Sequence, residues 1–162
     1  MKANDIIFEE RGPKITSADL RAVEGRLGVV LPDDYKQFLL VHNGAWSKRC
    51  RLKTTGQEIR QWLRVSDSTK LPIYSIVLAN ENIVSDVPSF RDFLSIAVTL
   101  DDWEVIMSMK EPQKYAIGLW YPYGAVEDTP DKVPLPFASF TEFVENLKHI
   151  ELSDVVNRFP PH

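Results

Sequence analysis

The stretch that decides the fold is LGVVLPDDYKQFLLVHNGAW, residues 27–46. Pro32 suits the first turn of a helix, and the two acids after it place negative charge where the first N–H groups of a helix point. Residues with i, i+3, i+4 and i+7 spacing follow, which is the spacing of one helix face: Tyr35, Phe38, Leu39 and His42. Asn43 and Gly44 end the pattern. The stretch therefore predicts a helix over 32–43 with one buried face.

A preceding helix is predicted over residues 16–28. Thr16 and Asp19 match a capping box, in which each side chain accepts a hydrogen bond from the other residue's backbone N–H. Gly28 is the residue type that most often ends a helix. The apolar residues between these ends share one face: Leu20, Val23 and Leu27. The N-terminal part of the chain is therefore expected to supply two amphipathic helices.

The clearest strand pattern is a three-strand meander over residues 93–121. Its predicted strands are FLSIAVT (93–99), WEVIMSM (103–109) and YAIGLWY (115–121). The short turns between them imply antiparallel pairing. Alternation along the second and third strands predicts Trp103 and Tyr121 in the core, and it places Trp120 on the opposite face from Tyr121.

The remaining elements have weaker patterns. A last helix is predicted over 139–150, where Ser139 begins a second capping box. Residues 51–55 and 61–66 are candidate strands, and the ambiguous segment 75–84 favours a helix. The fold class is therefore α+β: a largely antiparallel sheet, made of the meander and additional strands, covered by N-terminal helices and a C-terminal helix.

Length and composition set the remaining bounds. The 162 residues suit one domain, 1–162, with a core of about 16–150 and short extensions at both ends. A net charge of −4 argues against a general binder of nucleic acid or anionic membranes. The single Cys allows no internal disulfide and no cysteine-based zinc site. Without a secretion signal or an apolar run of about 20 residues, the chain is expected to be soluble and cytoplasmic.

The stretch 27–46 resembles the signature of the SUKH superfamily, which is named after regulators of yeast cell-wall synthesis of the Smi/Knr type. The residues that carry the signature are Leu31, Pro32, Tyr35, Phe38, Leu39, Asn43 and Gly44, after a helix that ends Leu27-Gly28. Ala45 replaces the family's last glycine. Downstream, FLSIAV (93–98) and SFTEFVENL (139–147) resemble a strand and the closing helix of the family.

The resemblance spans roughly residues 16–148, with one departure. The family usually has a Gly-Asp type of turn before the second meander strand, whereas this chain has Asp101-Asp102-Trp103-Glu104. The resemblance implies an α+β fold without a recognised active site or cofactor. Bacterial members are mostly immunity proteins that bind and neutralise a cognate toxin domain, often a nuclease or deaminase. Fungal members are interaction scaffolds, which is the alternative function, and a small hydrolase is a third. Whether the chain forms a homodimer stays open.

The residues that could carry catalysis lack partners at useful spacing. His42, His149 and His162 do not pair with a second ligand at metal-binding distance along the chain. His42 is expected to lie in the core or at the helix end. Cys50 follows Lys48 and Arg49, which would lower the pKa of its thiol if they came close. Since no base accompanies it, we expect Cys50 to be an inert small side chain.

Charge is segregated along the chain. Residues 48–64 contain six basic residues and one acid, and residues 85–131 contain nine acids and three basic residues. One interpretation is that the two charged surfaces pair with each other. The other is an acidic face for a basic toxin, because complementary charge speeds association and excludes wrong partners. The residues proposed for that face are Asp101, Asp102, Glu104, Trp120, Tyr123, Asp128 and Asp131.

Two alternatives remain open at this stage. The first is that Trp120 packs under a helical layer instead of contacting a partner. The second is that the partner binds the basic segment instead, through Trp46, Lys48, Arg49 and Arg51. Trp46 could equally cover the end of the preceding helix.

Overall fold

The structure is a computed structural model that describes residues 2, 5–65, 75–124 and 129–150. Its helices are α1 (Ser17–Leu27), α2 (Asp33–His42), α3 (Ile76–Asp86) and α4 (Phe140–Glu145), with the 3₁₀ turns η3 (Pro88–Asp92) and η4 (Pro130–Lys132). Its strands are β1 (Ala45–Leu52), β2 (Glu58–Trp62), β3 (Phe93–Thr99), β4 (Glu104–Ser108), β5 (Ile117–Trp120) and β6 (Leu147–His149).

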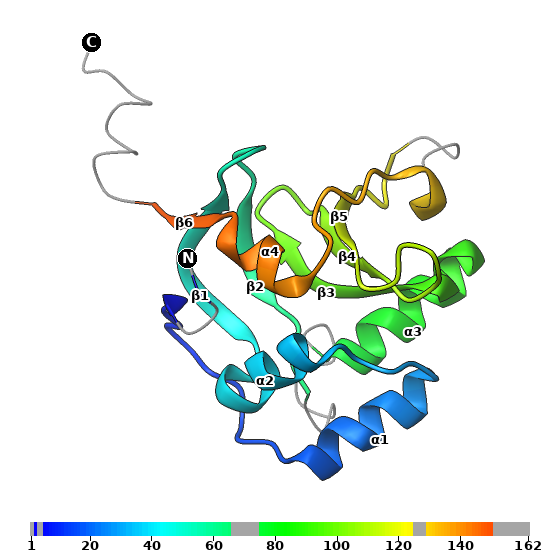
Figure 1. The fold of residues 1–162 in the computed structure, drawn as a ribbon, viewed down its shortest axis with the longest axis horizontal. Coiled ribbons are helices and arrows are strands. Elements are labelled where there is room, and N and C mark those ends of the chain that lie inside the picture. The colour runs from blue at the N-terminus through cyan, green and yellow to red at the C-terminus, as the bar shows by residue number, and fades with distance from the viewer. Residues whose placement is uncertain (1, 3–4, 66–74, 125–128, 151–162) are drawn as a thin grey trace.

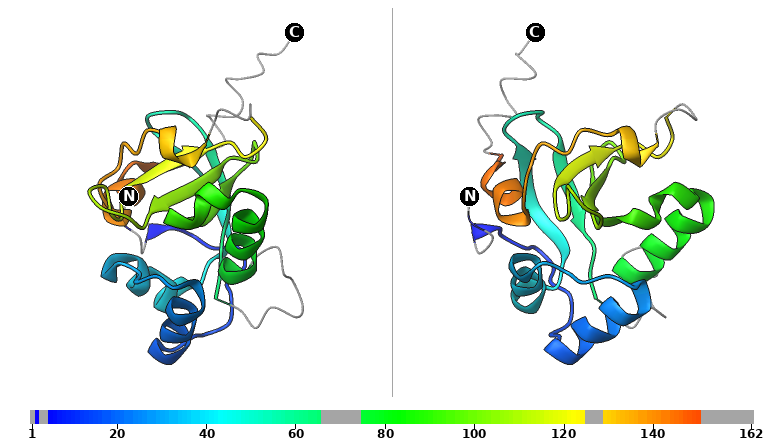
Figure 2. Two further views of the ribbon diagram at one scale, coloured as in Figure 1. Left: turned by 90° about the vertical axis from the view of Figure 1, so that its right-hand side faces the viewer. Right: turned by 45° about the vertical axis from the view of Figure 1, so that its right-hand side comes forward.

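The strands form one sheet in the order β5-β4-β3-β2-β1-β6, and every neighbouring pair is antiparallel. The predicted meander is confirmed as β3, β4 and β5. Figures 1 and 2 show a curled sheet with α1 and α2 below it and α4 lying against it. The α+β class predicted from the sequence is therefore confirmed.

The signature residues hold α2 against the sheet. Tyr35, Phe38 and Leu39 are buried on the inner face of the helix. Asn43 ends the helix in the left-handed conformation, with φ of 44°. Its side-chain Nδ2 donates to Val65 O at 2.8 Å, and its Oδ1 accepts from Val65 N–H at 2.8 Å. This amide therefore joins the end of α2 to the chain leaving β2.

Gly44 follows in the same left-handed region, with φ of 68°. A Cβ atom there would lie 2.4 Å from the Leu63 carbonyl oxygen. No ordinary side chain fits so close a contact with backbone. The Asn-Gly pair thus allows the chain to turn sharply from α2 into β1 while staying in contact with β2.

The main core is aromatic and lies between α2, α4 and the inner face of the sheet. The Phe38 ring is 5.0 Å from both the Trp62 ring and the Phe140 ring, centroid to centroid. The Trp62 Nε1–H donates to Ser47 Oγ at 3.2 Å, which satisfies its buried polar group. These contacts bring together α2, β1, β2 and α4, which are far apart in sequence.

A smaller core covers the other face of the sheet over β3, β4 and β5. It contains Phe90 of η3, Phe93, Ile106 and Trp120. The Trp120 ring stacks on Phe90 at 5.1 Å, and its side chain is 2% exposed. The meander is therefore buried on both faces. Trp120 packs under α3 and η3, and its assignment as an exposed contact residue is corrected.

The C-terminal helix is shorter than the predicted 139–150. It ends at Glu145, and Leu147–His149 form β6 instead, which pairs antiparallel with β1. The stripe that ends at Leu147 fits a helix, but β1 would otherwise leave its edge N–H and C=O groups unpaired at this point. Pairing with Cys50 and Leu52 satisfies them and still buries Leu147.

The other predicted elements are confirmed with shifted bounds. The candidate strands 51–55 and 61–66 correspond to β1 and β2, and both begin earlier than expected. The segment 75–84 is helical, as α3, and Ser75 caps it by accepting from the Leu78 N–H. The capping box that begins α1 is present, with Thr16 N–H donating to the Asp19 carboxylate at 2.7 Å.

Candidate partner-binding surface

The turn between β3 and β4 pushes two side chains out of the sheet. The Thr99 N–H donates to Trp103 O at 2.9 Å, and the Trp103 N–H donates to Thr99 Oγ1 at 3.0 Å. Asp102 adopts φ of 61°, a conformation that Asp tolerates better than most residues. Leu100 is 53% exposed as a result, and Asp101 is also exposed.

Three aromatic rings continue this exposed surface onto the end of β5. The Trp103 ring lies 5.4 Å from the Tyr121 ring, which lies 5.8 Å from the Tyr123 ring. Tyr121 is 37% exposed and Tyr123 is 76% exposed, while Trp103 is half-buried. We call Leu100, Trp103, Tyr121 and Tyr123 the aromatic rim.

The prediction that Tyr121 lies in the core is wrong, and Trp103 is only partly in it. β4 begins at Glu104 and β5 ends at Trp120, so both rings extend one residue beyond the paired strands. Alternation placed Trp103 and Tyr121 on the correct face of the sheet. That face is exposed where β4 begins and β5 ends, so the two rings are not fully covered. Two adjacent residues in the sequence could have indicated that the paired strands do not include these rings: the turn acid Asp102 before Trp103, and Pro122 after Tyr121.

The acids of the predicted surface differ in their surroundings. Asp102 pairs with Arg60 of β2, with Oδ1 2.9 Å from the guanidinium. Glu104 is half-buried and accepts a hydrogen bond from Ser95 Oγ. Burial raises the pKa of the Glu104 carboxyl, and the Ser95 hydrogen bond and nearby Arg60 partly oppose that shift. Within the ranges the structure describes, Asp101 has no ion-pair partner, so it is the acid of this turn that faces solvent unpaired.

Asp131 does not join this surface. Its carboxylate is 2.5 Å from Lys110 Nζ, which also reaches Asp92 at 3.4 Å. Lys110 follows Ser108, which ends β4, whereas Asp101 and Asp102 precede the start of β4. The structure thus separates Asp131 from the β3–β4 turn by the length of a strand. Asp128 lies outside the described residues.

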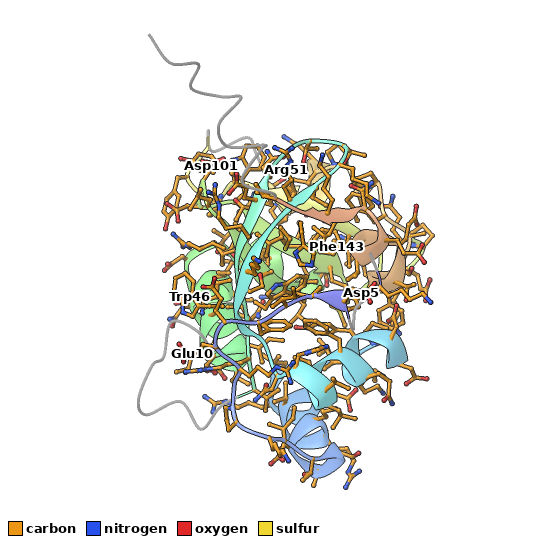
Figure 3. All side chains as sticks on the ribbon, turned by 90° about the vertical axis from the view of Figure 1, so that its left-hand side faces the viewer. Asp5, Glu10, Trp46, Arg51, Asp101 and Phe143 are labelled. Atoms are coloured by element: carbon orange, nitrogen blue, oxygen red, sulfur yellow. The ribbon has the colours of Figure 1, made fainter. Side chains whose placement is uncertain are left out.

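The basic alternative lies on β1, opposite one acid of β2, Glu58. Arg49 pairs with Glu58 at 2.7 Å, and Arg51 lies opposite Glu58 in the strand register. Trp46 is half-buried, and Lys48 is exposed, although its N–H donates to Ile7 O. Figure 3 shows Arg51 toward the same end of the molecule as Asp101, whereas Trp46, near the start of β1, lies away from that end.

The two charged segments are therefore in contact. The Leu100 N–H donates to Glu58 O at 2.8 Å, which places the β3–β4 turn beside the start of β2. The Arg60–Asp102 ion pair joins the segments directly. This confirms, at that pair, the interpretation that the basic and acidic surfaces pair with each other. Of the residues predicted for the acidic face, Asp101 and Tyr123 are the described ones that stay exposed outside an ion pair.

Two of the titratable residues considered for catalysis, His42 and Cys50, are buried. His42 stacks on Phe8 at 4.9 Å, and burial, followed by the charge of Arg11, lowers its pKa. Cys50 is buried, and burial raises the pKa of its thiol to about 11, which agrees with the expectation of an inert side chain and not with activation by Lys48 and Arg49. His149 contacts Asp5 O through Nε2 at 3.1 Å. His162 lies outside the described residues.

In the described ranges, no three His, Cys, Asp or Glu side chains are grouped so that they could hold a metal ion. None of the helices in those same ranges combines the length and apolar character that crossing a membrane requires.

The fold is an α+β domain in which an Asn-Gly turn joins two N-terminal helices to a six-stranded antiparallel sheet. The family model of the SMI1/KNR4 family (SUKH-1) matches residues 14–146, and the chain belongs to this family. The match covers the signature residues, whose contacts have just been described, and the resemblance inferred from the sequence is confirmed. A search of curated proteins finds no match to this chain.

Proposed function

We propose that this protein is a non-enzymatic, cytoplasmic immunity protein that binds and neutralises a cognate protein toxin with a basic binding surface. Membership of the SUKH-1 family supports this proposal, because bacterial members are mostly immunity proteins. The binding surface that we propose is the aromatic rim with Asp101, at the β3–β4 turn and the end of β5.

The observation that carries the proposal is the exposure of large apolar and aromatic side chains beside an unpaired acid. Leu100 is 53% exposed and Tyr123 is 76% exposed, although burying such side chains would be favourable. Clustered exposed apolar residues mark interaction sites more often than isolated ones do. Tyr and Trp are also enriched among the residues that contribute most to binding energy at interfaces.

Charge supports a basic partner. The chain has a net charge of −4, which attracts a cationic protein at a distance. At the rim itself, Asp102 pairs with Arg60, which also lies near the largely buried Glu104, so among the described residues Asp101 is the exposed acid of this turn without an ion pair. We therefore expect Asp101 to affect the rate of association and the aromatic side chains to affect the lifetime of the complex.

The non-enzymatic part of the proposal is supported by the state of the strongest nucleophile candidate. A nucleophilic cysteine acts as a thiolate in a partly exposed, electropositive site. Cys50 is instead buried, with Ser47 Oγ 3.8 Å from its sulfur and a pKa raised to about 11. The side chain behaves as a core residue at neutral pH.

The experiment identifies candidate toxin domains among the products of neighbouring genes, co-expresses each with this chain, and then measures binding with the purified pair. We expect the wild-type chain to protect cells and to bind directly. Asp101→Lys should slow association at low salt, and Tyr123→Ala should speed dissociation. Glu111→Lys is the matched control, because Glu111 is an exposed acid at the opposite end of β4.

The results separate the hypotheses. Protection that is lost with the rim variants but kept with Glu111→Lys supports the proposal. A soluble, folded chain that neither protects nor binds the toxin contradicts it. If the rim variants protect as well as wild type does, the interface lies elsewhere, and the basic surface around Trp46 and Arg51 becomes the next candidate.

A further inference from the structure

We propose that the aromatic rim and Asp101 together form a site for a single arginine side chain of the protein partner. This inference rests on the proposed function and deepens it, because it names the chemical group that the rim would recognise. It is carried by the arrangement of the rings and by the distribution of charge around them.

Two of the three rings are exposed to solvent, which makes them available to a cation. Tyr121 lies between Trp103 and Tyr123, and its ring plane makes an angle of 35° with the first and 75° with the second. The face of an aromatic ring carries negative electrostatic potential and attracts a cation within about 6 Å of its centroid. Because Tyr121 and Tyr123 are 37% and 76% exposed, a partner's side chain can reach these rings without any rearrangement of the core.

The carboxylate of Asp101 adds a full negative charge at the same turn, two residues before Trp103. Its neighbour Asp102 is already neutralised by Arg60 at 2.9 Å. In the part of the chain that the structure describes, Asp101 has no such cation. An incoming guanidinium would thus meet ring faces and an unpaired acid together.

Arginine fits this combination better than lysine does. Its guanidinium is planar, stacks on aromatic faces and is more weakly hydrated than an ammonium group. It can also donate two hydrogen bonds to one carboxylate while it is stacked. A second copy of this chain is not a suitable occupant, because two rims placed face to face would bring the two Asp101 carboxylates together.

The test uses the full chain and a small probe, so it does not depend on any toxin. N-acetyl-arginine amide is titrated into the isotopically labelled protein, and the indole N–H signal of Trp103 is followed by NMR. N-acetyl-citrulline amide, which has the same shape without the charge, is the matched probe. Trp62 is the internal control, because its indole is buried and bonded to Ser47.

We expect a saturable shift of the Trp103 signal with the arginine probe, with a dissociation constant on the order of millimolar or weaker, as suits a single side chain. Tyr121→Leu and Asp101→Asn should each weaken binding roughly 2- to 10-fold. Tyr121→Phe keeps the π face and should bind as wild type does. Glu111→Gln removes an exposed acid from the other end of β4 and should have no effect.

Equal shifts with the citrulline probe, or equal shifts of Trp103 and Trp62, would overturn the inference. So would full binding by both Tyr121→Leu and Asp101→Asn. The proposed function can fail separately. If the arginine probe binds selectively but the chain does not neutralise the toxin, the function is wrong and the arginine site stands. If the toxin is neutralised and the probe does not discriminate, the arginine site is wrong and the function stands.

Discussion

Four glycines provide a direct test of why the SUKH signature needs glycine at Gly44. Gly25 lies inside α1 with an ordinary φ and no atom within 4 Å of an added Cβ. Gly28 has φ of 67° and equally open surroundings. Gly118 has an ordinary φ, but an added Cβ would lie 2.3 Å from Pro134 O. Gly44 combines both constraints, with φ of 68° and a contact of 2.4 Å to Leu63 O. Changing each to Ala therefore separates the effect of backbone conformation from that of the close contact.

The expected effects follow from these surroundings. Gly25→Ala should stabilise the protein by about 1 kcal/mol, because Ala favours the helix. Gly28→Ala should destabilise it by about 1 kcal/mol, since the left-handed conformation costs roughly 1–2 kcal/mol and the stiffer unfolded chain offsets part of that. Gly118→Ala should cost roughly 1–3 kcal/mol through overpacking. Gly44→Ala should cost about 2–4 kcal/mol, which is the sum of the two effects.

Urea unfolding followed by far-UV circular dichroism measures these differences, and thermal unfolding provides a second readout. For a chain of this length, 1 kcal/mol corresponds to roughly 2–4 °C in Tm, so Gly44→Ala should lower Tm by roughly 5–15 °C. If Gly44→Ala costs no more than Gly28→Ala, the contact with Leu63 does not constrain this position, and our explanation of the Asn-Gly turn is refuted.

Four further outcomes are expected. Phe38→Ala should lower the free energy of unfolding by roughly 3–5 kcal/mol, because its ring is 2% exposed among other aromatic rings. Val41→Ala, on the exposed face of α2, should change that free energy by less than about 0.5 kcal/mol. The pKa of His42 is lowered in the folded state relative to 6.5, its usual value. The neutral side chain therefore contributes fully to stability above pH 6.5, and this contribution is lost as the pH falls below 6.5. His42→Phe should flatten that part of a plot of stability against pH. Ser139→Ala removes the cap of α4 and should cost about 1 kcal/mol in urea unfolding. Cys50 should react with a thiol reagent at neutral pH only as fast as the protein unfolds, and rapid reaction of the native protein would contradict its burial.

Features that depend on neighbouring residues could be predicted from the sequence. The helix α1 begins and ends at capping residues that act within four positions of the chain, as the Thr16–Asp19 capping box and the Gly28 N–H bond to Glu24 O show. The meander could also be predicted from the sequence, because alternation and short turns determine which strands pair. Asp101 and Tyr123 were expected at the surface because they lie in turns, and the structure places both there.

Other parts of the candidate site depend on contacts with distant segments. Alternation placed Trp120 and Tyr121 on opposite faces correctly, but it contains no information on which face is covered. Phe90, together with residues of α3 and of the chain after η4, covers Trp120, whereas Tyr121 is 37% exposed. Leu147 likewise suits a helix or a strand, and the exposed edge of β1 selected the strand.

The charge distribution also depends partly on the sequence alone and partly on the tertiary structure. The sequence by itself determined that basic residues gather in 48–64 and acids in 85–131. Only the tertiary structure decided that Arg60 meets Asp102, because antiparallel pairing of β2 with β3 brings the β3–β4 turn beside β2. That pairing neutralises Asp102 and leaves Asp101 with the exposed rings. Ion pairs between distant residues depend on strand register, and register follows from how the whole sheet buries its apolar faces.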